Sequence, residues 1–333
     1  MNICKNQLKK TMYNGVIGMA IGDALGVPVE FRERDTYTIS NMTTGTHGQK
    51  PGTWSDDTSM TLATLDSIRE KKCVNYEDIM NKFCNWLHNG KYTVRGDVFD
   101  VGVTTINAIN NYISGKPVMD CGEKAIYSNG NGGLMRILPV SILEPQNAVF
   151  VGMLTHAHPI SQIMYKMYTC FIQYLLTGMN KHVAYNMMLT KYKTNETISK
   201  EDISPFYSLY SLKRDEIKST GYVIDTLVAA FWCFILTDTY KDCVLTAVNL
   251  GGDTDTIAAI AGGIAGIYYG CTWNRPSYIR DVNNKKDILN KSSYIEAIPE
   301  EWIKQVAKYK YIKKLCYQAV SSHDFKIERI KDE

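Results

Sequence analysis

The amino-acid sequence predicts a mostly α-helical fold, because apolar residues recur at helical spacing along much of the chain. Runs of alternating apolar and polar residues between turn residues, which would indicate strands, are scarce. Two motifs rich in Asp, Ser and Thr stand directly before helical segments. These observations favour a helical domain in which polar side chains collect at helix N-termini.

Length and composition describe an ordinary globular protein. The 333 residues correspond to about two average domains, although one large domain is also allowed. The chain is 45% hydrophobic and 21% charged, which excludes a mainly disordered or fibrous protein. The longest apolar runs, 226–237 and 257–271, are shorter than the roughly 18 residues that indicate a membrane span, so no membrane partner is expected.

Cysteine usage and the N-terminal residues indicate the compartment. Residues 1–10 are polar and lack the apolar segment of a secretory signal. None of the nine cysteines forms a C-x-x-C pair, so neither a zinc site nor a redox pair is indicated. We therefore expect a reducing, cytoplasmic location.

Apolar stripes at helical spacing predict individual helices. The segment that begins near Asp225 is apolar on every face, which predicts a helix at the centre of the fold. The stripes of the three internal helices are Met80, Phe83, Cys84 and Leu87; Ile163, Met167, Cys170, Phe171 and Tyr174; and Leu227, Phe231, Phe234 and Ile235.

The Lys- and Tyr-rich segment 302–317 predicts one further helix. Trp302, Val306, Tyr309 and Ile312 share one face, which we expect to pack inward while the five lysines face water. A solvated helix face is favoured here over a nucleic-acid-binding patch. The net charge of only +3 also makes nucleic acid an improbable partner.

Three segments without periodicity predict loops. Residues 32–53 contain three glycines and join two motif-bearing segments. Loops of this length are usually functional or disordered, so we interpret this one either as a mobile flap or as a loop packed permanently on the surface. Residues 190–205 and 281–293 are polar and could be domain linkers, but apolar helical segments flank each of them, which favours solvated surface insertions.

The two polar motifs carry the strongest chemical signal. A helix cap needs one oxygen-bearing side chain, whereas each motif offers three or four. Grouped oxygen ligands suit hard cations such as Mg²⁺, Mn²⁺ or Ca²⁺, and four clustered carboxylates would repel one another without a cation. Taken together, the motifs favour a two-metal site over simple capping. They are Trp54-Ser55-Asp56-Asp57-Thr58, before a helical run to about Glu70, and Gly251-Gly252-Asp253-Thr254-Asp255-Thr256, before a helix rich in Ala and Gly.

The other candidate features are weaker. The helix after Thr256 contains several glycines, whose cost in helix stability indicates close packing against another helix. The Gly/Asn-rich segment 128–136 predicts either a phosphate-binding loop or a simple turn. Of His156 and His158, one histidine donating a hydrogen bond to a ligand is a better interpretation than a metal pair. Asp100 is either a helix cap or a site residue.

The order of these motifs resembles the ADP-ribosylglycohydrolase family. The segments that carry the resemblance are GDALGVPVEF, WSDDTSM, GDVFDVGVTT, NGNGGLMRILPV, THAHP, GYVIDTLVAAFW and NLGGDTDTIAAIAGGIAG, within residues 12–275. The resemblance implies an all-α, single-domain orthogonal helical bundle. It also implies a binuclear centre of two Mg²⁺ or Mn²⁺ ions. Residues 280–333 carry none of these motifs, and we interpret them as a Lys-rich helical extension of the same domain.

The resemblance also implies residue roles. Glu30 falls where a loop glutamate contacts metal or activates water in some members, and Asp100 matches an aspartate that faces the substrate ribose. Ser55 stands where many members have threonine and keeps the hydroxyl. The implied metal ligands are Ser55, Asp56, Asp57, Asp253, Asp255 and Thr256. The implied ADP-ribose-binding residues are Ser128, Asn129, Gly130, Asn131 and His156.

The expected activity is hydrolysis of the glycosidic bond between ADP-ribose and a modified acceptor, such as an arginine or serine side chain of a protein. ADP-ribosylated proteins, other ADP-ribosyl conjugates and ADP-ribose itself are the expected partners. Such a reaction passes through an oxocarbenium-like state, and a carboxylate can activate the attacking water. Three alternatives remain: a non-catalytic ADP-ribose-binding or structural member of the family, a Mg²⁺-dependent phosphatase, and a nucleic-acid-binding protein.

Overall fold

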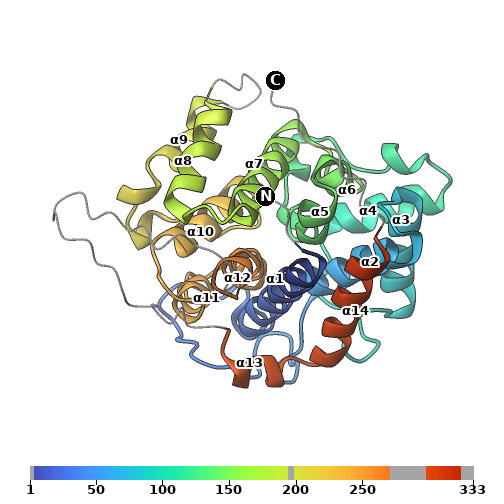
Figure 1. Ribbon diagram of the computed structural model, residues 1–333, viewed down its shortest axis with the longest axis horizontal. Coiled ribbons are helices and arrows are strands. Elements are labelled where there is room, and N and C mark those ends of the chain that lie inside the picture. The colour runs from blue at the N-terminus through green and yellow to red at the C-terminus, as the bar shows by residue number, and fades with distance from the viewer. Residues whose placement is uncertain (1–3, 194–198, 271–297, 324–333) are drawn as a thin grey trace.

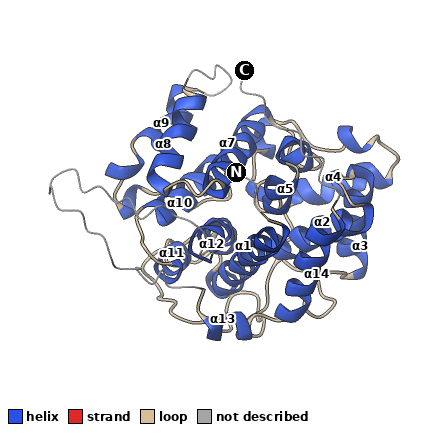
Figure 2. Cartoon of the chain, viewed as in Figure 1, coloured by secondary structure: helices blue, strands red, loops and turns tan. Residues whose placement is uncertain are grey.

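The computed structural model describes residues 4–193, 199–270 and 298–323, and over these ranges it contains helices, turns and loops but no β-strand (Figure 2). The all-α prediction is therefore confirmed. None of the described helices has the length and hydropathy needed to cross a membrane. The α-helices are α1 (Lys5–Gly26), α2 (Asp56–Lys71), α3 (Tyr76–Asn89), α4 (Val103–Ile113), α5 (Leu138–Leu143), α6 (Ala148–Met153), α7 (Pro159–Leu176), α8 (Lys181–Tyr192), α9 (Lys200–Tyr207), α10 (Val223–Ile235), α11 (Tyr240–Val248), α12 (Thr254–Gly270), α13 (Glu300–Gln305) and α14 (Tyr309–Ser322).

Helices α1 and α12 pack side by side at the centre of the molecule (Figure 1). Every residue of α12 from Thr254 to Tyr269 is buried. Glycines let the two backbones touch: a Cβ on Gly18 would overlap the Gly262 carbonyl oxygen, and one on Gly262 would overlap that of Gly18. The close helix packing expected from the glycines of α12 is present, and α1 supplies the partner.

We predict that Gly22→Ala destabilises the protein, because a Cβ there would overlap the Ala258 carbonyl oxygen of α12. Alanine gains about 1 kcal/mol of helix propensity over glycine, but overpacking against a rigid backbone costs typically about 1–3 kcal/mol and forces the helices apart. Urea unfolding should show a net loss of stability. Gly102→Ala is the control, since a Cβ there meets nothing within 4 Å. Equal stability of the two variants would contradict the prediction.

The helices predicted from apolar stripes are present as α3, α7 and α10. All residues of α10 except Asp225 are buried, as expected for a central helix. The helical run after the first polar motif is α2, and it ends at Lys71, one residue beyond the predicted end.

Part of the segment predicted as a loop over 190–205 is helical, so that prediction was wrong there. Helix α8 continues to Tyr192, and α9 begins at Lys200 behind the cap Ser199, whose Oγ accepts a hydrogen bond from the Asp202 N–H. Pro205 does not end α9, because the Ser204 hydroxyl donates to the Glu201 carbonyl that Pro205 leaves without a backbone donor. The predicted loop 281–293 lies outside the described residues.

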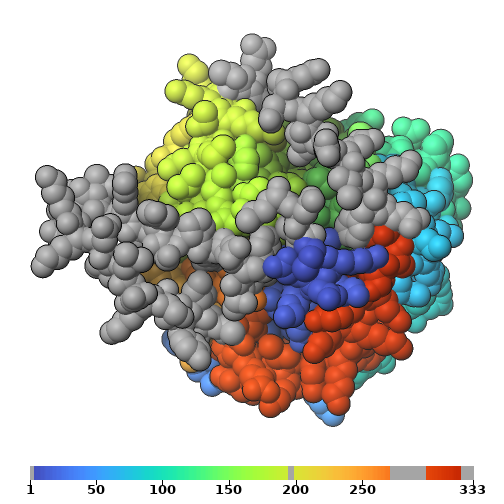
Figure 3. Space-filling model, viewed as in Figure 1, coloured from blue at the N-terminus to red at the C-terminus, as the bar shows by residue number. Residues whose placement is uncertain are grey.

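The C-terminal segment forms two helices, α13 and α14, instead of the single predicted helix. The break lies at Lys308, which adopts a left-handed backbone with φ 51°. The expected faces are otherwise correct: Trp302, Val306 and Ile312 are buried, Tyr309 is half-buried, and the five lysines are exposed. Helix α14 packs on α1 and α2, and Figure 3 shows it at the surface beside the N-terminal helix.

The long loop 32–53 has no regular secondary structure, but it is anchored along its length. Arg34 donates hydrogen bonds to the carbonyl oxygens of Leu250 at 2.6 Å and Ile217 at 2.6 Å. Ile39 and Met42 belong to the hydrophobic core. Of the two interpretations of this loop, the packed loop therefore describes its first half better than the mobile flap.

Candidate metal centre

The site lies where the end of α1 meets the N-termini of α2 and α12. Gly26, the last residue of α1, leaves no room for a side chain because its Cα lies against the Asp255 backbone. The Thr254 hydroxyl donates a 3.0 Å hydrogen bond to the Gly26 carbonyl. These contacts fix the first turn of α12 against α1.

Asp23 on α1 fixes the N-terminus of α2. Its Oδ1 accepts from the Ser55 N–H at 2.8 Å, and its Oδ2 accepts from the N–H and hydroxyl of Thr58 at 3.1 and 2.6 Å. Both oxygens are thus occupied by α2, which makes Asp23 a positioning group. Asp23 belongs to the segment GDALGVPVEF that carries the family resemblance, but the sequence analysis did not include it among the site residues.

Two glycines direct the chain into α12. Gly251 and Gly252 have φ values of 76° and 71°, a left-handed conformation that glycine adopts without steric cost. This turn lets the Gly252 carbonyl accept a 2.8 Å hydrogen bond from the N–H of Phe31, next to Glu30. The glycines therefore bring Asp253 and Asp255 beside the segment that carries Glu30.

The carboxylates form two overlapping groups. One oxygen from each of Asp23, Asp57 and Asp255 lies within 4.8 Å of the others, and the same holds for Glu30, Asp253 and Asp255. Asp255 belongs to both groups, so it lies at their junction.

Hydroxyl groups complete this set of oxygens. Ser55 Oγ and Thr256 Oγ1 lie 3.1 and 3.3 Å from the same oxygen, Asp57 Oδ2.

Asp56 is buried, and burial followed by the nearby charges of Asp57 and Asp100 raises its pKa well above the usual value for aspartate. It does not join either of the two carboxylate groups in the described part of the chain.

The electrostatics of the cluster fit a hard cation. Asp57 Oδ1, Asp253 Oδ1 and Asp255 Oδ2 are buried without a hydrogen-bond partner. Burial, followed by repulsion between neighbouring carboxylates, raises the pKa of Asp57 and Asp255 well above the usual value for aspartate. Unpartnered buried oxygens are costly in a native fold, and a divalent cation would satisfy them. The donors are carboxylates and hydroxyls, the ligands that Mg²⁺ and Mn²⁺ prefer.

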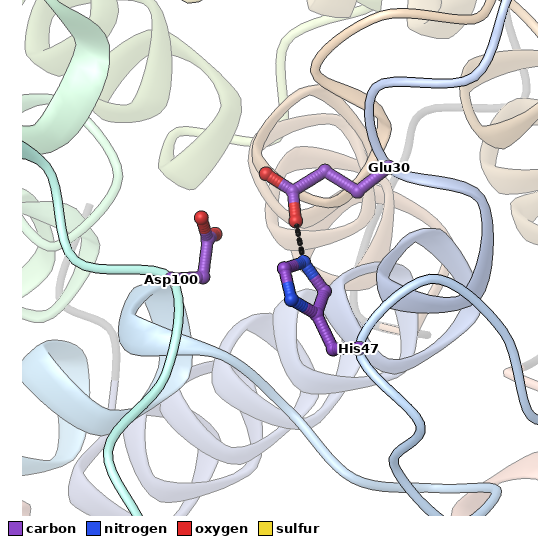
Figure 4. A group of neighbouring side chains, drawn as sticks. All are labelled: Glu30, His47 and Asp100. Atoms are coloured by element: carbon purple, nitrogen blue, oxygen red, sulfur yellow. Dashed lines mark hydrogen bonds and ion pairs between the residues drawn. The ribbon is translucent and has the colours of Figure 1, made fainter.

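Glu30 and Asp100 face each other at the edge of the cluster, with His47 beside them (Figure 4). Burial and then the Asp100 and Asp253 carboxylates raise the pKa of Glu30 to about 10. Asp100 is not a helix cap, because α4 begins later, behind Gly102. The sequence analysis missed His47, which lies in a loop that shows no periodic pattern.

The Gly/Asn-rich segment reaches the cluster through Asn131. Its amide nitrogen donates to Asp253 Oδ2 at 2.8 Å and to Thr226 Oγ1 at 2.9 Å. Gly130 forms an isolated β-bridge with Tyr222, which fixes the segment against the start of α10. Asn131 is therefore the residue of this segment that directly contacts the carboxylate cluster.

The side chains of Ser128 and Asn129 make hydrogen bonds elsewhere. Ser128 donates to Glu123 Oε2 at 2.8 Å, and Asn129 donates to the Ile126 carbonyl at 3.0 Å. Asn129 also accepts from the Ser161 hydroxyl. These bonds give the loop its shape, and neither side chain hydrogen-bonds a carboxylate of the buried cluster.

His156 and His158 have different surroundings. His158 is the N-cap of α7 and accepts from the Ile160 N–H, so its role is structural. His156 is buried, and its ring lies against Gly130 and Gly132. Burial and the nearby Arg136 lower the pKa of His156 to about 3, so its imidazole is neutral and able to donate or accept a hydrogen bond at this loop.

Comparisons with known proteins agree with this arrangement. The sequence profile of the ADP-ribosylglycohydrolase family matches residues 5–326. The ADP-ribosylarginine hydrolase Tri1 of Serratia proteamaculans is 33% identical over 263 residues, covering 77% of this chain and 70% of that protein. The ADP-ribosyl-[dinitrogen reductase] glycohydrolase of Rhodospirillum rubrum is 30% identical over 271 residues, covering 76% of this chain and 84% of the relative.

A solved structure supports the same fold. It is described as an ADP-ribosylglycohydrolase-related protein complex and superposes with a TM-score of 0.73 at 22% sequence identity. The superposition covers 96% of this chain and all of the other. From the profile match and the two relatives, we conclude that the chain belongs to the ADP-ribosylglycohydrolase family of hydrolases.

Proposed function

We propose that this protein removes ADP-ribose from modified arginine side chains by metal-dependent hydrolysis of the glycosidic bond. The observation that carries the proposal is the buried cluster of unpartnered carboxylate oxygens at the N-termini of α2 and α12. The names of two relatives, an ADP-ribosylarginine hydrolase and a dinitrogen reductase glycohydrolase, favour a protein substrate and an arginine linkage.

Two divalent cations, Mg²⁺ or Mn²⁺, would be held by oxygens of the two polar motifs. Asp57, Asp253 and Asp255 have the unpartnered oxygens that support this assignment. When bound, the cations would polarise water and hold the ribose hydroxyl groups. The full proposed ligand set is Ser55, Asp56, Asp57, Asp253, Asp255 and Thr256.

The surrounding residues would bind and orient the substrate. In this proposal the segment 128–131 and His156 hold the ADP portion, and Asn131 connects that segment to the carboxylate cluster. Asp100 would accept a hydrogen bond from the ribose. Glu30 would take the proton of the attacking water, which requires its carboxylate to be ionised. Glu30 is only 2% exposed, and this burial would keep bulk water away from the proton transfer.

The non-catalytic alternatives have less support. A family member that only binds ADP-ribose, or serves a structural role, has no need to bury mutually repelling carboxylates, which destabilise a fold unless a cation is present. This chain buries Asp56, Asp57 and Asp255 together, each with a raised pKa. That cost is explained most simply by metal binding for catalysis.

The test is to incubate the protein with peptides that carry ADP-ribose on arginine or on serine, and to measure released ADP-ribose by mass spectrometry. We expect release from arginine with Mg²⁺ or Mn²⁺, loss of activity in excess chelator, and recovery when either metal is returned. Full activity at a confirmed metal content of zero would contradict the metal-dependent mechanism. Release of phosphate in place of ADP-ribose would indicate a phosphatase.

A further inference from the structure

We propose that His47 is a positioning residue for Glu30: its imidazole Nε2–H donates a hydrogen bond to Glu30 Oε2 and fixes the direction of that carboxylate. The proposal rests on the function proposed above and extends it to a residue in the loop 32–53. It assigns this loop a role in the site that does not require the loop to move.

The contact between the two side chains is direct. His47 Nε2 lies within hydrogen-bond distance of Glu30 Oε2, and Figure 4 shows the second carboxylate oxygen on the side of Asp100. The Glu30 side chain is only 3% exposed and the imidazole 21%. A buried, ionised carboxylate requires hydrogen-bond donors in place of water, and the imidazole of His47 supplies one when its proton is on Nε2.

The backbone around His47 is fastened to the backbone around Glu30. The N–H of Thr46 donates to the Pro28 carbonyl at 2.9 Å, and its hydroxyl donates to the carbonyl of Glu30 itself at 3.1 Å. Gly45 packs on Pro28 so closely that a Cβ would overlap its carbonyl oxygen. The residues directly before His47 therefore fix its distance from Glu30, which is what a positioning role requires.

Phe99 holds the imidazole from another side. The ring centroids of His47 and Phe99 lie 5.3 Å apart with an interplanar angle of 41°. Phe99 directly precedes Asp100, so one short segment supplies both the aromatic contact to His47 and the carboxylate that faces Glu30. Loss of the His47 donor would leave Glu30 free to turn toward Asp100 or away from the attacking water.

The kinetic test compares His47→Leu with His47→Gln, whose side-chain amide can donate from nearly the same position. We expect His47→Leu to lower kcat about 10- to 100-fold at little change in KM, and His47→Gln to recover most of that loss. In a Glu30→Gln background, His47→Leu should lower kcat no further, because His47 acts only through Glu30. Thr44→Ala, an exposed residue of the same loop, is the control and should retain full activity.

One kinetic outcome and one change in metal content would each overturn the proposal. An equal loss from His47→Leu in the wild-type and Glu30→Gln backgrounds would show that His47 acts independently of Glu30. A reduced metal content in His47→Leu, measured by elemental analysis, would show that the imidazole is a metal ligand.

A measurement that needs no turnover separates this proposal from the proposed function. Long-range ¹H–¹⁵N NMR of the metal-loaded protein reports which imidazole nitrogen carries the proton. We expect His47 to be protonated at Nε2 and that resonance to shift in Glu30→Gln. An unprotonated Nε2 would overturn the positioning role even in an active enzyme. If the wild type releases no ADP-ribose but the expected NMR result is seen, the proposed function fails while the His47–Glu30 pairing stands.

Discussion

Replacing Asp255 with alanine is expected to remove metal binding and activity together. Asp255 lies at the junction of both carboxylate groups, and its Oδ2 is buried without a partner. Metal assistance is worth several kcal/mol and each 1.4 kcal/mol is a factor of ten, so we expect turnover to fall by about 10³-fold or more. Metal content measured after dialysis should fall in parallel.

The fold itself should tolerate this change. In the metal-free protein Asp255 is repelled by Glu30, Asp57 and Asp253, so the metal-free variant should be at least as stable as the metal-free wild type. The wild type should gain thermal stability when Mn²⁺ is added, and the variant should not. Metal-dependent stabilisation of Asp255→Ala equal to that of the wild type would contradict the assignment.

The matched control for this experiment is Asp242→Ala. Asp242 is also an aspartate in the first turn of a helix, α11, but it is exposed and pairs with the Thr239 hydroxyl of its own cap. Its loss should cost about 0.3–1 kcal/mol of helix stability and leave metal content and turnover unchanged.

The features that sequence predicted well are those set by local chemistry. Helix α10 follows from an apolar stripe, and the glycines of α12 indicate a close helix partner before that partner is known. The first polar motif predicts the start of α2 because Ser55 and the two following aspartates satisfy a helix N-terminus. Each of these signals is local, because the residues that produce it lie within one helix or directly before it.

The features that sequence missed depend on residues far apart in the chain. Asp23 holds α2 through hydrogen bonds to residues more than thirty positions away. His47 reaches Glu30 only because Gly45 and Thr46 dock on Pro28. No local periodicity encodes such contacts, so the sequence of the loop 32–53 did not indicate that the His47 side chain lies in the site.

Two further predictions, the loop over 190–205 and the single C-terminal helix, were wrong for local reasons that the pattern of apolar and polar residues does not show. Helix α9 is short and polar, but Ser199 caps it and the hydroxyl of Ser204 compensates for Pro205. The break between α13 and α14 at Lys308 occurs where the Ala307 N–H donates to the Gly52 carbonyl of the long loop. In both cases hydrogen bonds of polar groups decide where a helix begins, continues or ends, and the apolar pattern does not record them.

Glu30→Gln is expected to lower turnover by about 10²–10⁴-fold while metal content and ADP-ribose affinity stay near those of the wild type, because glutamine cannot accept the proton of the attacking water. Burial and the Asp100 and Asp253 carboxylates raise the pKa of Glu30 to about 10 in the metal-free protein, so the group is protonated at neutral pH. Positive charge from bound cations lowers the pKa of a nearby carboxyl. Metal loading should therefore ionise the base as well as complete the site.

The pH dependence of the metal-loaded enzyme tests this role of Glu30. A general base works only when ionised, so wild-type kcat should rise with pH as one group loses its proton, and that rise should be absent from the residual activity of Glu30→Gln. Glu33→Gln, an exposed glutamate three residues further along, is the control and should keep the wild-type profile. If Glu30→Gln retains near-wild-type turnover and the same pH dependence, Glu30 is not the base. Asp100, the carboxylate that faces it, is then the residue to replace with asparagine, because it is the remaining predicted catalytic group at that edge of the cluster.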